Sequence, residues 1–288
     1  MVYDTIKKEA EDLLEEMIAF RRDFHKYAET GWFEIRTASK VARYLTELGY
    51  EVLVGREVCQ EEARMGVPDQ DELDRQYERA MEQGADPEFA PLLKDGFTGV
   101  IGILHCGEGP VVAMRFDMDA LGVIEDTQQT HRPAKEGFAS VNYGFMHACG
   151  HDGHTTVGLG TAKVLMDMKK FLHGTVKLIF QPAEEGVRGA KSIVEHGHLD
   201  DVDVFLGSHV TGVQEAEGDY DLIPGAGGSL ATTKLDVTYH GKAAHAGGSP
   251  EEGNNVMLSI ATAILNLYAI PRHSQGETRI NVGRIEAG

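Results

Sequence analysis

One stretch of the sequence, Val176-Lys177-Leu178-Ile179-Phe180-Gln181-Pro182-Ala183-Glu184-Glu185-Gly186, joins a short apolar run to two adjacent carboxylates. Residues 176–180 have the length and the β-branched and aromatic content of a buried strand. Glu184 and Glu185 follow its end, where neighbouring carboxylates are costly to keep unless a cation neutralises them. Most Glu-Glu pairs are solvated, so this pair alone leaves a functional and a structural interpretation about equally open.

A second stretch, His147-Ala148-Cys149-Gly150-His151-Asp152-Gly153-His154, places a thiol, three imidazoles and a carboxylate within eight residues. Cysteine and histidine two positions apart can bind one divalent cation, and the glycines leave the backbone free to aim both side chains. A polar loop with a buried thiol and surface histidines is the alternative, and it is the commoner one for an isolated Cys-x-His pair. Other metal-capable residues in the chain favour the metal site.

Two further apolar runs end in the same way. Residues 110–115 lead into Asp117 and Asp119, and residues 202–207 lead into His209. Helical segments alternate with these runs, which is typical of a doubly wound α/β sheet whose strand ends converge on one crevice. A single metal-capable residue after a strand can occur by chance, whereas four such groups in succession indicate one shared site.

The types of side chain indicate which cation would bind. Thiolate, imidazole and carboxylate together suit Zn²⁺, Mn²⁺ or Co²⁺ better than Mg²⁺ or Ca²⁺. More than three candidate ligands indicate two ions that share a site, and such pairs commonly generate hydroxide and polarise a carbonyl.

Composition narrows the class of protein. The chain has 288 residues, 42% hydrophobic and 25% charged, which suits one large domain or two smaller ones. Its 46 acidic against 27 basic side chains give a net charge of −19, which argues against nucleic-acid and membrane partners. Three cysteines are too few for a disulfide framework, and no secretory signal or bilayer-spanning run is evident. The expected compartment is the cytoplasm.

Periodicity predicts the remaining elements. We expect helices over residues 3–28 and 34–48, a strand over 51–54, a solvated acidic helical insert over 56–95, neighbouring core strands over 99–104 and 110–115, and helices over 155–168 and 190–196. His25, on the first helix, is more often a core or surface histidine than a ligand and is left out of the site. From residue 230 the pattern changes to a strand over 232–239, an apolar helix over 255–270 and a strand over 279–284. This order predicts the start of a small α+β domain.

Four motifs together resemble the di-metal amidohydrolases of the aminoacylase and carboxypeptidase superfamily. They are Arg115-Phe116-Asp117-Met118-Asp119-Ala120-Leu121, Met146 with the His147 to His154 stretch, Gln181-Pro182-Ala183-Glu184-Glu185-Gly186, and Gly241-Lys242-Ala243-Ala244-His245-Ala246. The resemblance implies a catalytic domain with a mixed doubly wound sheet over residues 1–224. It also implies an inserted α+β lid or dimerisation domain, which residues 225–288 begin and do not complete.

The resemblance also implies a ligand set. Cys149, His151, Glu185 and His209 would bind two divalent ions, Mn²⁺ or Zn²⁺, and the Cys149 thiolate would bridge them. Members of the superfamily continue past the equivalent of Gly288 and supply a last histidine ligand and carboxylate-binding arginines there. Four of five expected ligands are therefore present, and we expect the chain by itself to be inactive.

Other residues receive roles in the same way. Glu184 would be the general base, and Asp117 would orient a metal ligand from behind it. His245 would stabilise the oxyanion by reaching into the active site of a second, partner chain, and Asn255 would contact substrate. The implied assembly is a homodimer, or a heterodimer with a related subunit.

The implied reaction is hydrolysis of the amide between an aryl acyl group and an amino acid. We expect p-aminobenzoyl-glutamate as the substrate, with hippurate or indoleacetyl-amino acids as the alternative. A truncated, non-catalytic subunit is the alternative from another class, and metal content would separate it from the enzyme.

Overall fold

The computed structural model describes residues 2–210 and 231–288. The chain divides into two units, Met1–Glu215 and Ala216–Gly288, and each is described by itself. The expected domain boundary between residues 224 and 225 lies outside the described residues.

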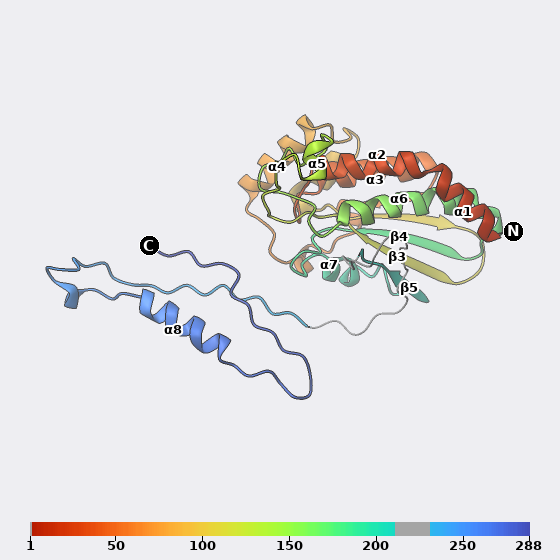
Figure 1. The fold of residues 1–288 in the computed structure, drawn as a ribbon. Coiled ribbons are helices and arrows are strands. Elements are labelled where there is room, and N and C mark those ends of the chain that lie inside the picture. The colour runs from red at the N-terminus through yellow and green to blue at the C-terminus, as the bar shows by residue number, and fades with distance from the viewer. Residues whose placement is uncertain (1, 211–230) are drawn as a thin grey trace. The chain divides into compact units, whose positions relative to one another are not determined.

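A mixed sheet of five strands forms the centre of the first unit (Figure 1). The strands are β1 (Glu51–Val54), β2 (Val100–His105), β3 (Val111–Asp117), β4 (Thr175–Gln181) and β5 (Val204–Gly207), in the spatial order β1-β2-β4-β3-β5. β3 is parallel to both β4 and β5, whereas β2 is antiparallel to β1 and to β4. The predicted mixed α/β sheet is confirmed.

The prediction that β2 and β3 are neighbours is wrong, because β4 lies between them. Thr175 at the start of β4 is paired with His105 on one side and with Val111 on the other. The short connection from β2 to β3 crosses this end of β4, where the amide of Cys106 donates to the carbonyl of Gly174 at 2.8 Å. A connection of this length suits a hairpin equally well, so the local sequence does not distinguish the two arrangements.

Helices cover both faces of the sheet. Helices α1 (Val2–Asp12), α2 (Leu14–Lys26), α3 (Ile35–Leu48) and α6 (His151–Asp167) lie on one side, and α7 (Ala190–Glu195) lies on the other (Figure 1). Alternate strand residues serve the two layers. Leu178 and Phe180 pack in the core beneath α3 and α6, whereas Ile179 packs with Ile193 of α7.

Some helix bounds differ from the predicted ones. The first predicted helix is interrupted at Leu13, although the Leu13 amide still donates to the carbonyl of Glu9 at 3.1 Å. Helix α3 ends as predicted, because Gly49 has the left-handed φ of 90° that closes the last turn. Helix α6 begins at His151, four residues before the predicted start, so the second half of the stretch from His147 to His154 lies on a helix.

The acidic insert is more closely packed than predicted. Its main helix, α4 (Gln70–Glu82), buries Leu73 and Ala80, and Asp69 caps it by accepting from the amide of Glu72 at 2.9 Å. The short helices of the first unit are η1 (Gly55–Glu57), η2 (Glu61–Ala63), η3 (Ala90–Gly96), α5 (Arg132–Lys135) and η4 (Lys169–Phe171).

Residues 231–288 of the second unit contain η5 (Pro250–Glu252), α8 (Met257–Tyr268) and a single bridge between Lys242 and Asn254. The strands predicted over 232–239 and 279–284 are not formed there. A strand needs a partner for its backbone groups and a layer for its apolar face, and both of these segments are exposed except for an intermediate Val282.

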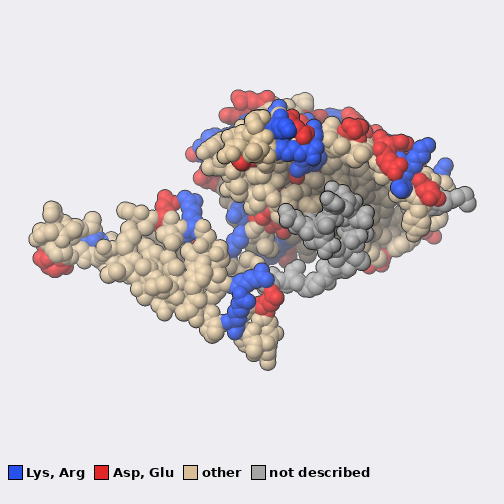
Figure 2. All heavy atoms as spheres, viewed as in Figure 1, with Lys and Arg blue, Asp and Glu red and all other residues tan. Residues whose placement is uncertain are grey.

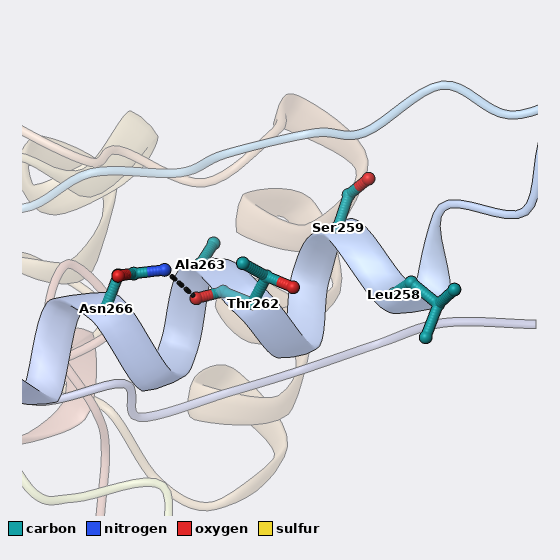
Figure 3. A pocket seen from close by; sticks show the side chains of 5 residues that line it. All are labelled: Leu258, Ser259, Thr262, Ala263 and Asn266. Carbon is teal, nitrogen blue, oxygen red and sulfur yellow. Dashed lines mark hydrogen bonds between the residues drawn. The ribbon is translucent and has the colours of Figure 1, made fainter.

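Helix α8 is apolar but buries none of its side chains. A pocket lies along one side of it, and its lining comes from that helix alone (Figure 3), namely Leu258, Ser259, Thr262, Ala263 and Asn266. It contains none of the candidate site residues. Among the helices that the structure describes, none is both long enough and apolar enough to cross a bilayer.

Charge is distributed over the surface rather than gathered in one block. Figure 2 shows Asp and Glu side chains over the visible face of the first unit, with Lys and Arg among them, whereas the visible surface of residues 231–288 is mostly uncharged.

Helix α6 packs closely against the sheet at Gly158. A Cβ atom there would lie 2.7 Å from Cε1 of Phe180 and 2.8 Å from Cγ of Phe116. We therefore expect Gly158→Ala to lower the free energy of unfolding by about 1–3 kcal/mol, because two buried rings would have to shift. Chemical denaturation followed by circular dichroism measures this loss.

The matched control is Gly153→Ala in the same helix, where a Cβ atom would meet nothing within 4 Å. We expect it to be neutral or to stabilise by up to about 1 kcal/mol. Equal losses in the two variants would contradict the close-approach explanation.

Candidate metal centre

The sheet brings its polar strand ends to one edge. Asp117 at the end of β3 is paired with Gln181 at the end of β4, and Arg115 is paired with Gly207 at the end of β5. Because these three strands are parallel, the segments that follow them leave the sheet on the same side. Those segments carry Asp119, Glu184, Glu185 and His209.

Cys149 precedes the N-terminus of α6, and the first turn of that helix contributes the imidazoles of His151 and His154. Gly150 precedes the helix with a left-handed φ of 95°, and a Cβ atom on it would lie 2.5 Å from Cγ2 of Val210. Only glycine suits both the backbone conformation and the close approach. The turn places the rings of His151 and His154 in a stack with 5.3 Å between their centroids.

Among the described residues, three groups have ligand atoms close enough to hold a metal ion, and His151 belongs to all of them. The groups are Cys149, His151 and His209; Asp117, His151 and His154; and His151, Glu184 and Glu185, each with its ligand atoms within 4.8 Å of one another. The six first-unit residues to which the sequence analysis gave a role (Asp117, Cys149, His151, Glu184, Glu185 and His209) are therefore brought together.

The distances between candidate ligand atoms show how far apart these atoms lie. Sγ of Cys149 lies 3.4 Å from Nε2 of His209. Nε2 of His151 lies 3.8 Å from an oxygen of Glu184 and 3.8 Å from an oxygen of Glu185. The Cys149–His209 contact is a hydrogen bond to sulfur, whereas the two His151 distances are longer than hydrogen bonds, as between ligands of a shared cation.

Unpaired buried atoms provide a test of whether a metal fits. Both ring nitrogens of His151 and Oε1 of Glu185 are buried and have no hydrogen-bond partner within the described part of the chain. Buried polar atoms are almost always paired. A divalent cation would satisfy these atoms, and the mixture of thiolate, imidazole and carboxylate is one that Zn²⁺ and Mn²⁺ accept.

Negative charge accumulates at this centre. Burial, together with the nearby carboxylates of Glu185 and Glu184, raises the pKa of the Cys149 thiol to about 12. Burial is also the main reason why the pKa of Glu185 is raised, and His151 only partly offsets it. A bound cation would reverse both effects, because it favours the charged forms of its ligands.

Asp117 is held by a hydrogen bond from an imidazole and by an ion pair with an arginine. Burial by itself would raise its pKa, but a hydrogen bond with Nδ1 of His154 at 2.5 Å and an ion pair with Arg115 at 2.6 Å lower it. The amide of Val210 donates to Nε2 of His154 at 2.8 Å. His154, which the sequence analysis quoted without assigning it a role, therefore links Asp117 to the segment that carries His209.

Asp119 holds the two glutamates through their backbone. Its Oδ1 accepts from the amide of Glu184 at 2.9 Å, and its Oδ2 accepts from the amide of Glu185 at 2.8 Å. Oδ1 of Asp119 also lies 3.4 Å from Nδ1 of His151, whereas Asp117 lies on the Nε2 side of that ring at 3.7 Å. Asp119 therefore lies closer to the His151 ring than Asp117 does.

Glu34 completes the support of this turn and was missed in the sequence. Its Oε1 accepts from the amide of Ala183 at 2.7 Å, and its Oε2 accepts from the hydroxyl of Thr98 at 2.6 Å. Burial and the charge of Asp119 raise the pKa of Glu34. Two fully buried carboxyl groups thus bind three consecutive amides, and no local pattern around Glu34 could have indicated this.

The contacts of His245 and Asn255 are local to the second unit. Nδ1 of His245 accepts from the amide of Gly248 at 2.8 Å, and Oδ1 of Asn255 accepts from the amide of Met257 at 2.9 Å. Their roles toward substrate stay predictions.

The chain belongs to the peptidase family M20/M25/M40, since residues 113–278 match the model of that family. It is 51% identical over 271 residues to one of the subunits of the p-aminobenzoyl-glutamate hydrolase of Escherichia coli (strain K12). It is also 51% identical over 278 residues to the indole-3-acetyl-aspartic acid hydrolase of Enterobacter agglomerans. These matches cover 93% and 96% of the chain but only 61% and 63% of the relatives, so the chain spans less than two thirds of their length.

Solved structures support the same fold. An aminobenzoyl-glutamate utilization protein from Klebsiella pneumoniae matches with a TM-score of 0.74 and 39% identity, over 98% of this chain and 64% of that one. A dinuclear metal binding peptidase of the M20 family from Bacillus subtilis matches with a TM-score of 0.50 and 33% identity, over 70% of this chain and 44% of that one.

The support from Glu34 can be measured. We expect Glu34→Ala to lower the free energy of unfolding by about 2–4 kcal/mol, because it leaves the Ala183 amide and the Thr98 hydroxyl unpaired beside a cavity. Glu34→Gln keeps an acceptor for the Ala183 amide and should lose less than half as much. Urea denaturation compares the two variants, and equal losses would show that hydrogen bonding by this side chain is unimportant.

Proposed function

We propose that this chain is part of a metal-dependent amidohydrolase that cleaves p-aminobenzoyl-glutamate to p-aminobenzoate and glutamate. The observation that carries the proposal is the Glu184–Glu185 pair, which two buried carboxyl groups hold beside Cys149 and His151. The identity to the Escherichia coli hydrolase supports this choice of substrate.

Cys149, His151, Glu185 and His209 are the proposed ligands of two divalent ions, Mn²⁺ or Zn²⁺. The dinuclear metal binding peptidase from Bacillus subtilis supports two ions rather than one. Bound there, the ions supply Lewis acidity toward the substrate carbonyl. Asp119 lies on the Nδ1 side of the His151 ring and Asp117 lies on its Nε2 side.

Glu184 is the proposed general base. Its side chain is 35% exposed, so water can reach it, and one of its oxygens lies 3.9 Å from the guanidinium of Arg115. It takes a proton from the attacking water and passes it to the departing amine. Glu185, whose own amide donates to the same Asp119, is less exposed at 25% and faces His151.

A second chain and a cytoplasmic location complete the proposal. The Escherichia coli relative is one subunit of its hydrolase, which supports an assembly of two chains, either identical or related. His245 would then stabilise the oxyanion in the site of the partner, and Asn255 would contact substrate. All three cysteines are free thiols, which suits a reducing compartment.

A second candidate substrate is indole-3-acetyl-aspartate, because the Enterobacter agglomerans relative is equally identical to this chain. Both substrates are amides of an acidic amino acid with an aromatic acyl group. The non-catalytic alternative remains distinguishable, since it predicts one ion or none per site.

The roles of the two glutamates can be separated in a version extended to the length of the Escherichia coli relative and loaded with Mn²⁺ or Zn²⁺. We expect Glu184→Gln to reduce kcat for p-aminobenzoyl-glutamate about 10²–10⁴-fold with metal content unchanged. We expect Glu185→Gln to lose metal as well as activity. Metal analysis together with steady-state kinetics tests both, and a Glu184→Gln variant with full activity would refute the general-base assignment.

Substrate choice is tested in the same extended protein by comparing kcat/KM for p-aminobenzoyl-glutamate, indole-3-acetyl-aspartate and hippurate. We expect p-aminobenzoyl-glutamate to be the best of the three. A higher value for indole-3-acetyl-aspartate would select the second candidate. A metal-loaded, folded protein that cleaves none of them would favour the non-catalytic alternative.

A further inference from the structure

His25 lies on α2, outside the candidate metal centre, and both of its ring nitrogens face carboxylates. Nδ1 lies 2.8 Å from Oδ2 of Asp152, and Nε2 lies 2.9 Å from Oε1 of Glu125. All three side chains are nearly inaccessible, with exposed fractions of 2%, 1% and 5%. His25 therefore joins two segments that are 127 and 100 residues away along the chain.

The two acceptors determine the charge of the ring. A neutral imidazole would turn an unprotonated nitrogen toward one carboxylate, so the ring donates from both nitrogens only as the imidazolium. Burial would lower the pKa of His25, but the hydrogen bonds with Asp152 and Glu125 outweigh it and raise that pKa. The result is a buried cation between two anions.

Asp152 links this bridge to the metal centre. It follows His151 in the first turn of α6, and its Oδ1 accepts from the amide of Gly153 at 2.9 Å. Its Oδ2 lies 2.8 Å from Nε of Arg21, so α2 holds this carboxylate with two cationic groups. Because consecutive residues of a helical turn share one backbone geometry, fixing Asp152 also fixes the direction of His151.

We propose that His25 is a positioning residue for the metal centre: by bridging Asp152 and Glu125 it holds the first turn of α6 so that Cys149 and His151 point at a shared cation. The inference rests on the metal centre proposed above. It assigns a function to a histidine that would otherwise be part of the core, and it predicts an effect on metal binding beyond any effect on stability.

His131 provides a matched control. Its Nε2 lies 2.8 Å from the same Oε1 of Glu125 that faces His25, and none of its described contacts reaches α6. His131→Gln therefore disturbs the Glu125 end of the bridge and leaves the Asp152 end in place. His25→Gln removes the cation and can donate to only one of the two carboxylates at a time.

The test is a Co²⁺ titration of the 288-residue chain, read from the thiolate-to-cobalt and d–d absorption bands, with the unfolding midpoint measured in parallel. We expect His25→Gln to weaken Co²⁺ binding about 10–100-fold and to alter the thiolate band. His131→Gln should bind Co²⁺ like the wild type. Wild-type affinity and spectrum in a folded His25→Gln variant, or an equal loss in His131→Gln, would overturn the proposal.

Asp152→Asn keeps the test decisive if His25→Gln does not fold, because it removes the partner charge and preserves the shape of the side chain. It should weaken Co²⁺ binding in the same direction. The double variant should bind Co²⁺ no more weakly than the weaker-binding single variant, because both changes break the same contact. Additive losses of affinity in the double variant would refute the route through Asp152. A wild-type chain that binds no Co²⁺ would overturn the metal centre itself, and with it this inference.

Discussion

The structure of the candidate site depends on two hydrogen bonds, from the amides of Glu184 and Glu185 to the carboxylate of Asp119. Acidic and thiol side chains gather at one edge of the sheet, and a turn carrying two of them would be pushed outward by repulsion. Asp119 uses backbone dipoles rather than side-chain cations to hold that turn, so the side chains of the two glutamates stay available. The adjoining bond from Ala183 to Glu34 fixes the residue before them.

The sheet topology makes this arrangement possible. Asp119 follows β3 and the two glutamates follow β4, and the in-register pair of Asp117 and Gln181 puts both segments at the same height. Parallel neighbours are required, because antiparallel strands would send the two segments to opposite edges. β4 therefore has to lie next to β3, and β2 is displaced to its other side.

The sequence predicted well those features that depend on neighbouring residues in the chain. Period and residue type identified the run that became β4 and the polar residues after β3, β4 and β5, and α/β topology predicted that these ends meet. Strand order was not predictable, because pairing partners are chosen over long distances. The same holds for Glu34 and His25, whose partners are 149 and 127 residues away. Alternation over 232–239 and 279–284 suggested strands, but alternation describes one face of a strand and supplies no partner.

The energetics of burial decide between the two interpretations of the Glu-Glu pair. A solvated surface pair needs no support, since water pairs its amides and separates its charges. Here the fully buried Asp119 binds those amides, and the fully buried Glu34 binds the adjoining amide of Ala183, although burial raises the pKa of Glu34. An arrangement that is unfavourable for stability is retained where the placement of side chains matters more, and such placement is typical of a functional site. The cost of burying Glu34 and Asp119 therefore argues that the direction of Glu184 and Glu185 is what the local structure maintains.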